Sequence, residues 1–397
     1  MRFVFFDFTI NFGGGPQGSV YLAERLNQGH KVVVLDAYGS CAEYCGAVEK
    51  AGLRLQILYP KQENPYIGYA GRPFRRFLRG ALQVPEFLRI RHRLRKALLE
   101  LKPDVVWVNN YKSLFFVGLS GCFARCPVVV YVRGWGTPDQ MNPVFVRLLK
   151  GPVSAVIAHA RATVEQLARQ GVPREKLHYA PNTVNFDTIV RNAAKPLDEP
   201  KPNGNGYPKI LLPAARPVRE KGHLTALSAL VRLKNRGYEP VLWLPGKTAM
   251  GADSSFIRQM EGFIREKNLE TNVHFLGWRT DMEALVHACD VVILPSHTEG
   301  FPRIILEAML LKKPVIATGV GGIPETLIHE QTGIMIDVDD EEGLAEGIVR
   351  YAEDAAFRQR IVRQAYAYVC EHHHPDKHTQ KVIEVFESVC RERKGLV

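Results

Sequence analysis

Cysteine is sparse in this sequence, and its spacing does not suit the usual cysteine-based structures. The 397 residues include seven cysteines, an odd number, and none of them forms a C-x-x-C pair. This pattern speaks against a disulfide framework or a cysteine zinc site and favours reduced, buried thiols in the cytoplasm. His372, His373, His374 and His378 lie near Cys370 in one polar stretch. We expect a solvated turn there and no metal site.

Long apolar runs are also lacking. No stretch reaches the roughly 18 apolar residues that a membrane-spanning helix needs. The first run, residues 2–10, carries Asp7 in its middle and is followed by glycines, so we expect a β-strand and no signal peptide. Internal repeats and low-complexity tracts are missing as well. The composition is typical of a soluble globular protein, and the length predicts two domains.

Acidic residues are scarce in the N-terminal half. Residues 1–200 contain 27 Lys and Arg against 15 Asp and Glu, whereas residues 201–397 contain 25 against 26. The net charge of +11 therefore belongs to the first half. Much of it lies in residues 72–102, the basic segment. The arginines that we single out there are Arg72, Arg75, Arg76, Arg79, Arg89, Arg91, Arg93 and Arg95.

Apolar residues recur between these arginines at helical spacing, which leaves two main interpretations. A basic amphipathic helix can lie on an anionic membrane surface. An ordinary surface helix, with leucines facing the core and solvated arginines, gives the same pattern. Nucleic acid is the least favoured partner, because zinc-finger spacing and aromatic-interleaved sheet motifs are missing. We expect no nucleic-acid binding.

A glycine-rich loop follows the first apolar run. Gly13, Gly15 and Gly18 match G-x-G-x-x-G, and a second apolar run ends in Asp36, as in dinucleotide-binding folds. In such folds the first glycine comes directly off the strand, whereas here Ile10–Phe12 intervene. The loop is therefore either a cofactor site or a plain strand-to-helix turn, with Asp36 a strand-end carboxylate in the second case.

Short β-branched runs alternate with helical patterns, which is typical of parallel α/β sheets. Residues 191–208 are rich in Pro, Asn, Gly and charge, so we expect a linker or variable loop there. The alternation restarts over 209–375, and 376–397 reads as a C-terminal helix that can pack back on the N-terminal domain. We predict two Rossmann-like domains, 1–190 and 209–375, with a ligand cleft between them.

Residues 294–325 carry the densest group of candidate site residues. A strand ends near Leu294, and a helix opens near Pro302, so backbone N–H groups gather there as they do at phosphate sites. Glu299 and Glu307 flank this turn. Carboxylates beside a phosphate repel it unless they face hydroxyls of the same ligand, which suggests a nucleotide sugar.

Cations for such a diphosphate occur in ARPVREKG, which contains Arg216 and Lys221. An arginine supplies a planar fork of donors and a lysine a compact point charge, and both suit phosphate oxygens.

Five motifs, in order and spacing, resemble the C-terminal domain of family 4 retaining glycosyltransferases, which have the GT-B fold. They are ARPVREKG, VHFLGW, DVVILPS, TEGFPRIILEAM and PVIATGVGGIPE. Upstream, HARATVEQLARQGVPREKLHYAPNTVNF resembles the last segment of the family's N-terminal domain, and FGGGPQGS its first loop. The resemblance is strong over residues 209–340, weak over 40–130, and uninformative on the acceptor.

By this resemblance, Arg216 and Lys221 bind the donor diphosphate, Glu307 binds the ribose and Glu299 binds hydroxyls of the transferred sugar. The other implied donor-binding residues are Gly300, Phe301, Pro302, Arg303, Ile304, Gly277, Gly14 and Gly15. Gly277 would lie near the base. The loop of Gly13 to Gly18 would lie near the donor phosphates and the acceptor, which disfavours the dinucleotide interpretation.

One position departs from the family pattern. Many members carry a histidine after the strand that here reads PVVVYVRGW, and this chain has Arg133. An arginine cannot act as a general base at neutral pH. We expect Arg133 to bind an anionic acceptor or the donor phosphate, with a surface arginine at a strand end as the alternative.

The combined prediction is a metal-independent retaining glycosyltransferase with a UDP-sugar donor, GDP-sugar being the next choice. The expected acceptor is a glycan or lipid-linked molecule of cell-envelope or exopolysaccharide synthesis. We expect a cytoplasmic protein that contacts the inner membrane face. The alternatives are another GT-B nucleotide-sugar enzyme such as an epimerase, an NAD-dependent oxidoreductase using Gly13–Gly18, or a catalytically silent basic docking protein.

Overall fold

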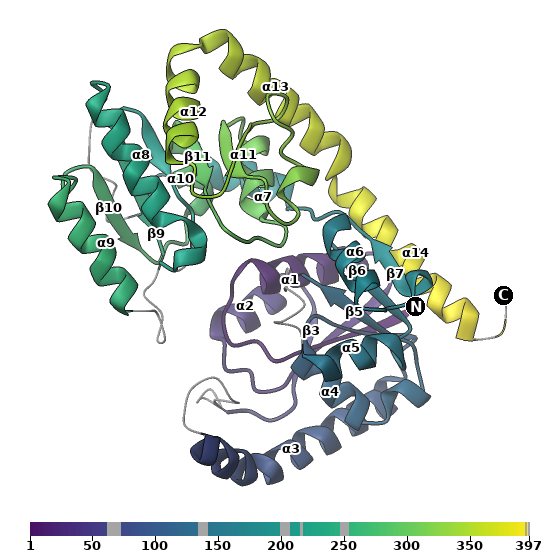
Figure 1. Ribbon diagram of the computed structural model, residues 1–397. Helices are drawn as coiled ribbons and strands as arrows, with labels where there is room; N and C mark the ends of the chain where they lie inside the picture. The colour runs from purple at the N-terminus through teal and green to yellow at the C-terminus, as the bar shows by residue number, and fades with distance from the viewer. Residues whose placement is uncertain are drawn as a thin grey trace. The chain divides into compact units, whose positions relative to one another are not determined.

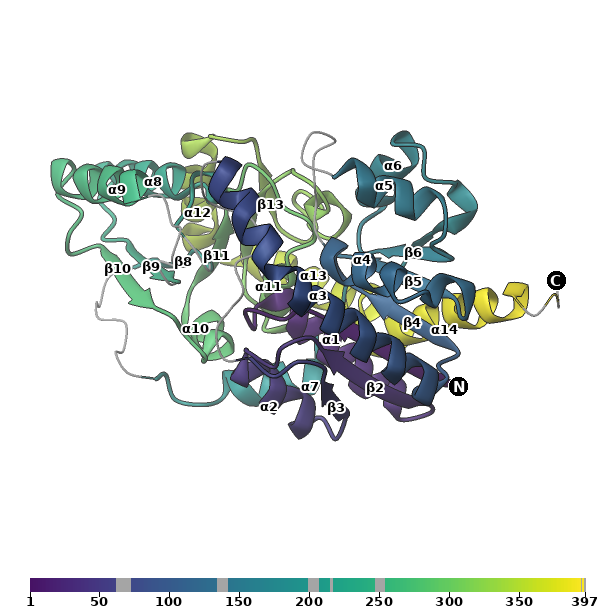
Figure 2. The same cartoon turned by 90° about the horizontal axis from the view of Figure 1, so that it is seen from below.

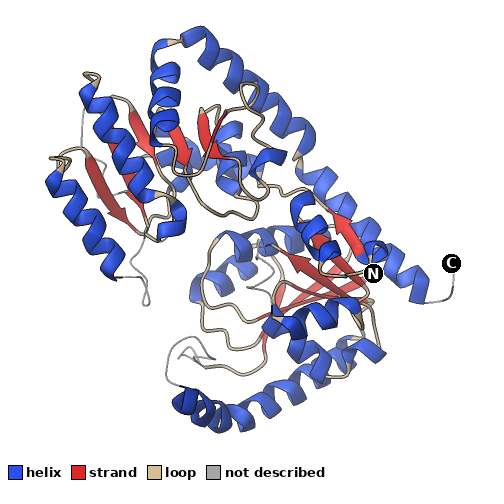
Figure 3. Ribbon diagram, in the orientation of Figure 1, coloured by secondary structure: helices blue, strands red, loops and turns tan. Residues whose placement is uncertain are grey.

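The computed structural model describes residues 1–61, 73–133, 142–198, 207–214, 217–246, 254–393 and 395. The chain forms two compact units. Unit 1 comprises Met1–His159, Val164–Ala180 and His378–Val397, and unit 2 comprises Ala160–Thr163 and Pro181–Lys377. Strands and helices alternate in both (Figures 1 and 3).

Unit 1 contains a seven-stranded parallel sheet in the order β3-β2-β1-β4-β5-β6-β7. Its strands are β1 (Arg2–Asp7), β2 (Lys31–Asp36), β3 (Arg54–Ile57), β4 (Val105–Val108), β5 (Val128–Val132), β6 (Ala155–Ala158) and β7 (Leu177–Tyr179). The order reverses direction between β1 and β4. In doubly wound sheets of this type, ligands bind beyond the carboxyl ends of the strands at that switch point.

Helices cover both faces of this sheet. They are α1 (Gly14–Asn27), α2 (Ala42–Lys50), α3 (Pro73–Leu101), α4 (Tyr111–Leu119), α5 (Pro143–Lys150), most of α6 (Arg161–Arg169) and most of α14 (Pro375–Arg393). Phe386 of α14 packs its ring 5.0 Å from that of Phe3 and 5.7 Å from that of Trp107. The C-terminal helix therefore completes the core on one face of the unit 1 sheet.

Unit 2 repeats the topology with a six-stranded parallel sheet in the order β10-β9-β8-β11-β12-β13. Its strands are β8 (Lys209–Leu211), β9 (Val241–Pro245), β10 (Val273–Gly277), β11 (Val291–Leu294), β12 (Val315–Thr318) and β13 (Ile334–Ile336). Here the switch point lies between β8 and β11. The two sheets confirm the predicted pair of Rossmann-like α/β domains.

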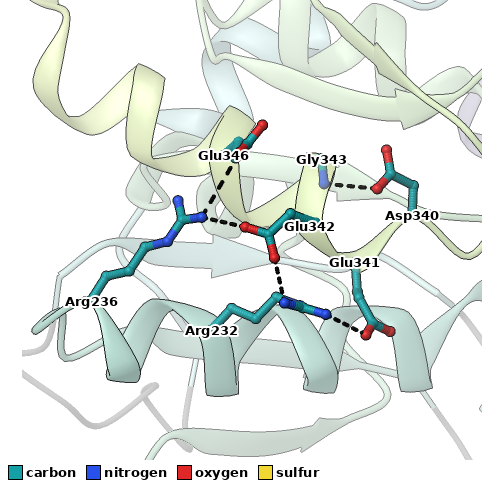
Figure 4. A network of polar contacts seen from close by, with 7 residues as sticks. All are labelled: Arg232, Arg236, Asp340, Glu341, Glu342, Gly343 and Glu346. Atoms are coloured by element: carbon teal, nitrogen blue, oxygen red, sulfur yellow. Dashed lines mark hydrogen bonds and ion pairs between the residues drawn. The ribbon is translucent and has the colours of Figure 1, made fainter.

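The helices of unit 2 are α7 (Phe186–Ala193), α8 (His223–Asn235), α9 (Ser254–Glu266), α10 (Met282–Ala288), α11 (Arg303–Leu310), α12 (Glu341–Glu353) and α13 (Ala355–His372). An exposed network ties α8 to α12 (Figure 4). Arg232 contacts Glu341 at 2.8 Å and also Glu342, and Arg236 pairs with Glu342 as well. Such shared pairs orient helices, although exposed ion pairs contribute little to stability individually.

None of the helices in the described ranges combines the length and apolarity that crossing a bilayer requires.

Candidate active site

The loops that follow β8 and β11 meet at the switch point of unit 2. A short 3₁₀ turn, Arg219–Lys221, ends the first loop, and Gly222 follows it with φ +67°. A Cβ on Gly222 would lie 1.8 Å from the carbonyl oxygen of Pro295. The N–H of His297 donates to the carbonyl of Glu220 at 2.8 Å. Glycine at 222 therefore lets the two loops pack backbone against backbone.

This packing brings Lys221 and Glu299 into contact. The Nζ of Lys221 lies 2.6 Å from Oε1 of Glu299, and the Oγ of Ser296 donates to the same oxygen at 2.9 Å. The carboxylate is 12% exposed and the lysine side chain 32% exposed. A cation and a carboxylate thus reach the surface of unit 2 side by side, with one carboxylate oxygen held by two donors.

Two further glycines, Gly321 and Gly322, support the loop that carries Glu299. Gly321 has φ +58°, and a Cβ there would lie 1.8 Å from the carbonyl oxygen of Glu299. The N–H of Gly322 donates to the carbonyl of Gly300 at 2.7 Å. Phe301 is buried, and its carbonyl accepts from Nδ2 of Asn182 at 3.3 Å. The Glu299–Phe301 backbone is therefore held on several sides.

Helix α11 starts directly after this loop. Pro302 is the residue that precedes its first turn, so the N–H groups of Arg303 and Ile304 belong to the N-terminal end of the helix. The first N–H groups of a helix have no intrahelical acceptor and carry a partial positive charge. The predicted arrangement of Gly300 to Ile304, a loop leading into a helix N-terminus, is the arrangement in the structure.

Glu307 lies one turn further along α11. Its Oε1 is 3.8 Å from a guanidinium nitrogen of Arg303, and its side chain is only 15% exposed. Burial raises the pKa of Glu307, and Arg303 offsets part of that rise. A partly desolvated carboxyl suits neutral hydroxyls as partners.

Gly277 ends β10 with φ +65°, and its carbonyl accepts from the N–H of Gly246 at 2.7 Å. Trp278 beside it is 47% exposed. The positive φ favours glycine at 277, and the proximity to a nucleobase stays a prediction.

In unit 1, the glycine loop differs from a dinucleotide turn. β1 ends at Asp7 and α1 starts at Gly14, so residues 8–13 separate the strand from the helix. The carboxylate of Asp36 accepts from the N–H groups of Thr9, Tyr38 and Gly39 and is buried. Asp36 is thus the strand-end carboxylate of the second interpretation, already engaged by backbone.

The start of α1 is held by Asn109, the residue after β4, and lies near Arg133. Asn109 donates to the Oγ of Ser19 at 2.5 Å, and that hydroxyl donates to the carbonyl of Gly15 at 3.0 Å. A Cβ on Gly15 would lie 3.9 Å from Cδ of Arg133. The Nη1 of Arg133 lies 3.0 Å from Nε2 of His159. Gly14, Gly15 and Arg133 therefore share one region of unit 1.

Family comparisons agree with this geometry. The model described as Glycosyltransferase Family 4 matches residues 12–188, and that described as Glycosyl transferases group 1 matches residues 195–368. The first covers most of unit 1, and the second covers the loops of Lys221 and Glu299 and the helix α11 that carries Glu307. The chain belongs to glycosyltransferase family 4.

Individual relatives of this family 4 chain match over different lengths. Lipopolysaccharide core biosynthesis glycosyltransferase LpsE of Rhizobium meliloti is 23% identical over 75% of this chain and 82% of its own length. The N-acetyl-alpha-D-glucosaminyl L-malate synthase of Bacillus anthracis is 30% identical over 33% of this chain, and the match spans only 35% of that enzyme.

The solved structure of HepE from Anabaena with UDP and glucose has a TM-score of 0.76 to this chain. It is 20% identical over 98% of this chain and 100% of the HepE chain. The fold of this family 4 chain is therefore GT-B.

The basic segment of the family 4 chain forms α3, and Figure 2 shows α3 beside α4. Ile90, Leu94 and Leu98 of α3 are buried. Arg89, Arg91, Arg93 and Arg95 are exposed, as are Val84, Leu88 and Leu99. The helix thus buries one apolar stripe and leaves further apolar residues among its arginines. Arg72 lies outside the described residues, as do the side chains of Arg75, Arg76 and Arg79.

The expectation for the histidine stretch is wrong for two residues. His373 is 2% exposed and its Nδ1 lies 2.8 Å from the carbonyl of Asn182, while His378 is 4% exposed and lies 3.1 Å from the hydroxyl of Tyr131. Both pack in cores instead of a solvated turn, because the stretch joins two packed helices. In the part of the chain that the structure describes, no three His, Cys, Asp or Glu side chains are grouped to hold a metal.

Two residues that contact predicted site residues were not themselves predicted, one in each unit. His159 contacts Arg133 in unit 1, and Ser296 contacts Glu299 in unit 2. The sequence could have identified His159, because both it and Arg133 directly follow strands of the same sheet. Arg216 lies outside the described residues of this family 4 chain.

Proposed function

We propose that this chain is a retaining glycosyltransferase that moves a sugar from a nucleoside-diphosphate sugar to a glycan or lipid-linked acceptor. The observation that carries the proposal is the meeting of Lys221, Glu299 and the start of α11 at the switch point of unit 2. The cation and the backbone N–H groups suit a diphosphate. The carboxylate can accept hydrogen bonds from the sugar hydroxyls of the same ligand. The structure of HepE was solved with UDP and glucose, which supports a UDP-sugar as the donor.

Donor binding divides between these groups. The ammonium of Lys221 has three donors, so it can hold Glu299 and a phosphate oxygen at the same time. By the family resemblance, Arg216 adds a second cation. The N–H groups at the start of α11 and these cations would offset the charge of the departing diphosphate, a role that a metal ion fills in other enzymes. We therefore propose transfer without a metal.

The two glutamates would orient the neutral parts of the donor. Glu299 accepts hydrogen bonds from Lys221 and Ser296, and its second oxygen can accept from a sugar hydroxyl. Glu307, whose pKa is raised by burial, would accept from the ribose hydroxyls. Both are binding residues in this proposal, and neither is the nucleophile.

Retention of configuration follows from attack on the face that the leaving group vacates. The bond between the anomeric carbon and the phosphate oxygen breaks, the acceptor oxygen bonds to the same carbon, and the hydroxyl proton passes to the phosphate. The departing diphosphate is both the leaving group and the base. The reaction therefore needs no side-chain base at position 133, where this chain has an arginine.

Thermal unfolding with UDP-, GDP- and ADP-sugars and with NAD tests the proposal first. A ligand that binds only the folded state at about 100 times its Kd adds about 2.7 kcal/mol. We expect stabilisation by a UDP-sugar that Glu307→Ala abolishes. Glu270→Ala is the control, because Glu270 is an exposed carboxylate elsewhere in unit 2.

Product analysis then tests the reaction. We expect transfer to an added acceptor, an anomeric configuration equal to that of the donor by NMR, and no loss of rate in excess EDTA. Stabilisation by NAD alone would contradict the proposal in favour of an oxidoreductase. Conversion of the donor without any acceptor would indicate an epimerase.

A further inference from the structure

Strand register places Arg133 and His159 side by side. β5 pairs with β6 in parallel, and Val132 is the partner of Ala158. The residues that follow these two, Arg133 and His159, therefore leave the same edge of the unit 1 sheet from neighbouring strands. This is the carboxyl edge, where parallel sheets hold their ligands.

A buried aromatic cluster holds this pair. The guanidinium of Arg133 lies over the ring of Tyr131, 4.5 Å from its centroid, and the ring of His159 lies 4.8 Å from that of Tyr131. Tyr131 and His159 are buried. The hydroxyl of Tyr131 is in turn 3.1 Å from Nε2 of His378, whose ring stacks 6.1 Å from that of His159.

The contact between Arg133 and His159 requires one protonation state of the imidazole. A guanidinium is always charged and only donates hydrogen bonds. Nε2 of His159, 3.0 Å from Nη1, must therefore carry a lone pair. A second proton would remove this acceptor and place a positive charge beside the guanidinium. Among the residues that the structure describes, the titratable or charged groups seen to contact His159 include Arg133, Tyr131 and His378.

We propose that His159, through its unprotonated Nε2, is the positioning residue that aims Arg133 at a phosphoryl group of the substrates. The inference rests on the proposed glycosyl transfer and deepens it. The Cδ of Arg133 lies near Gly15, 3.9 Å from where a Cβ on that glycine would be, at the N-terminal end of α1. Arg133 is thus a fixed cation beside the loop that the family resemblance places near the donor phosphates and the acceptor.

The phosphoryl group can belong to the donor diphosphate or to an anionic acceptor, and kinetics distinguish these sources. If Arg133 holds the donor, Arg133→Gln raises KM for the donor. If it holds the acceptor, the change appears in KM for the acceptor. Loss of a charge-assisted hydrogen bond predicts a fall in kcat/KM of roughly ten- to hundredfold in either case.

Four variants separate positioning from mere packing. His159→Leu removes the acceptor at similar volume, and we expect it to lower kcat/KM about as much as Arg133→Gln. The double variant should be no worse than Arg133→Gln alone, because both changes remove the same aimed cation. His159→Gln keeps an acceptor that does not titrate. We expect it to restore the neutral-pH rate and to remove the fall in kcat/KM on the acid side.

His378→Gln is the matched control, since His378 belongs to the same cluster but bonds to Tyr131. It should keep the wild-type pH profile. A wild-type rate in His159→Leu, or an unchanged acid limb in His159→Gln, would overturn the proposal.

Arginine side-chain NMR keeps the inference testable without turnover. We expect pyrophosphate to shift the Arg133 guanidinium signals in the wild type at neutral pH, and less in acid, with His159→Gln responding equally at both. No response at any pH would overturn the inference. A response in a protein that transfers no sugar would mean that only the proposed function had failed.

Discussion

At the residue scale, the candidate donor site depends on places where a Cβ has no room. A Cβ on Gly222 would lie 1.8 Å from the carbonyl oxygen of Pro295, and a Cβ on Gly321 would lie 1.8 Å from that of Glu299. Both glycines have positive φ. They set how closely the loops bearing Lys221 and Glu299 approach, because backbone cannot yield as a side-chain tip can.

Gly321→Ala should therefore impair function more than stability. The left-handed φ alone costs an alanine about 1–2 kcal/mol, and the added methyl must also displace the Glu299 backbone. A shift of about 1 Å in a substrate-positioning group can cost about a hundredfold in rate. We expect a loss of that order in kcat/KM for sugar transfer.

Gly237→Ala is the control for this substitution. Gly237 has φ +85° and open space around its Cβ position. An alanine there has an unfavourable positive φ, as one at 321 does, but its methyl group meets no neighbouring atom. We expect normal kcat/KM there. Equal kinetic losses in the two variants would mean that the Glu299 backbone tolerates the shift.

Residue types and spacing predicted the individual candidates but not their partners. Glu299 and Glu307 were found because they flank a strand-to-helix turn. The sequence did not predict the ion pair of Lys221 with Glu299. This pair joins residues 78 positions apart through a loop contact that Gly222 permits. The two buried histidines were missed because a polar stretch reads as solvated unless the helices on either side are known to pack.

At the scale of elements, the structure of α3 is compatible with both interpretations of the basic segment. Its Ile90, Leu94 and Leu98 stripe faces the core, as in an ordinary surface helix. Val84 and Leu88 remain 48% and 53% exposed, and on the adjoining α4 Phe115 and Leu119 are 40% and 43% exposed. Arg91 joins the two helices by donating to the carbonyl of Leu119 at 2.7 Å.

The prediction of contact with an anionic membrane applies to this α3–α4 surface, because it combines arginines with exposed apolar side chains. Arginines near such a membrane contribute about 1 kcal/mol each. Arg89→Ser with Arg95→Ser should thus lower partitioning onto vesicles containing anionic lipid by about tenfold or more, measured by sedimentation at physiological salt. Both arginines are exposed.

Arg258→Ser, an exposed arginine of α9 in unit 2, is the control and should leave partitioning unchanged. Zwitterionic vesicles should bind all three proteins weakly. If the double variant kept wild-type binding to anionic vesicles, the arginines of α3 would be solvated side chains of an ordinary surface helix.

At the scale of the whole molecule, the two units should respond differently to acid. Burial lowers the pKa of His223 and of His373, both in unit 2, to about 4. The unfolded chain binds these protons near pH 6.5, so their contribution is complete above that pH and is lost as pH falls towards 4. Burial raises the pKa of Asp7 in unit 1 to about 6. That contribution is complete below about pH 3.8 and is lost as pH rises through 6.

Unit 2 should therefore be more acid-labile than unit 1, where burial lowers the pKa of His30 and of His178 and so offsets part of the gain from Asp7. From pH 7 to pH 5 each of the two histidines should cost unit 2 about 2 kcal/mol, whereas Asp7 makes unit 1 more stable. Hydrogen exchange, corrected for intrinsic rates, should show core amides of β8, β11 and β12 losing protection before those of β1 and β4.

His373→Gln should reduce the loss of protection in unit 2, because the glutamine amide can still donate to the carbonyl of Asn182 and does not titrate. His92→Gln on exposed α3 should not. Equal loss in both units would mean that the buried histidines do not control the acid response.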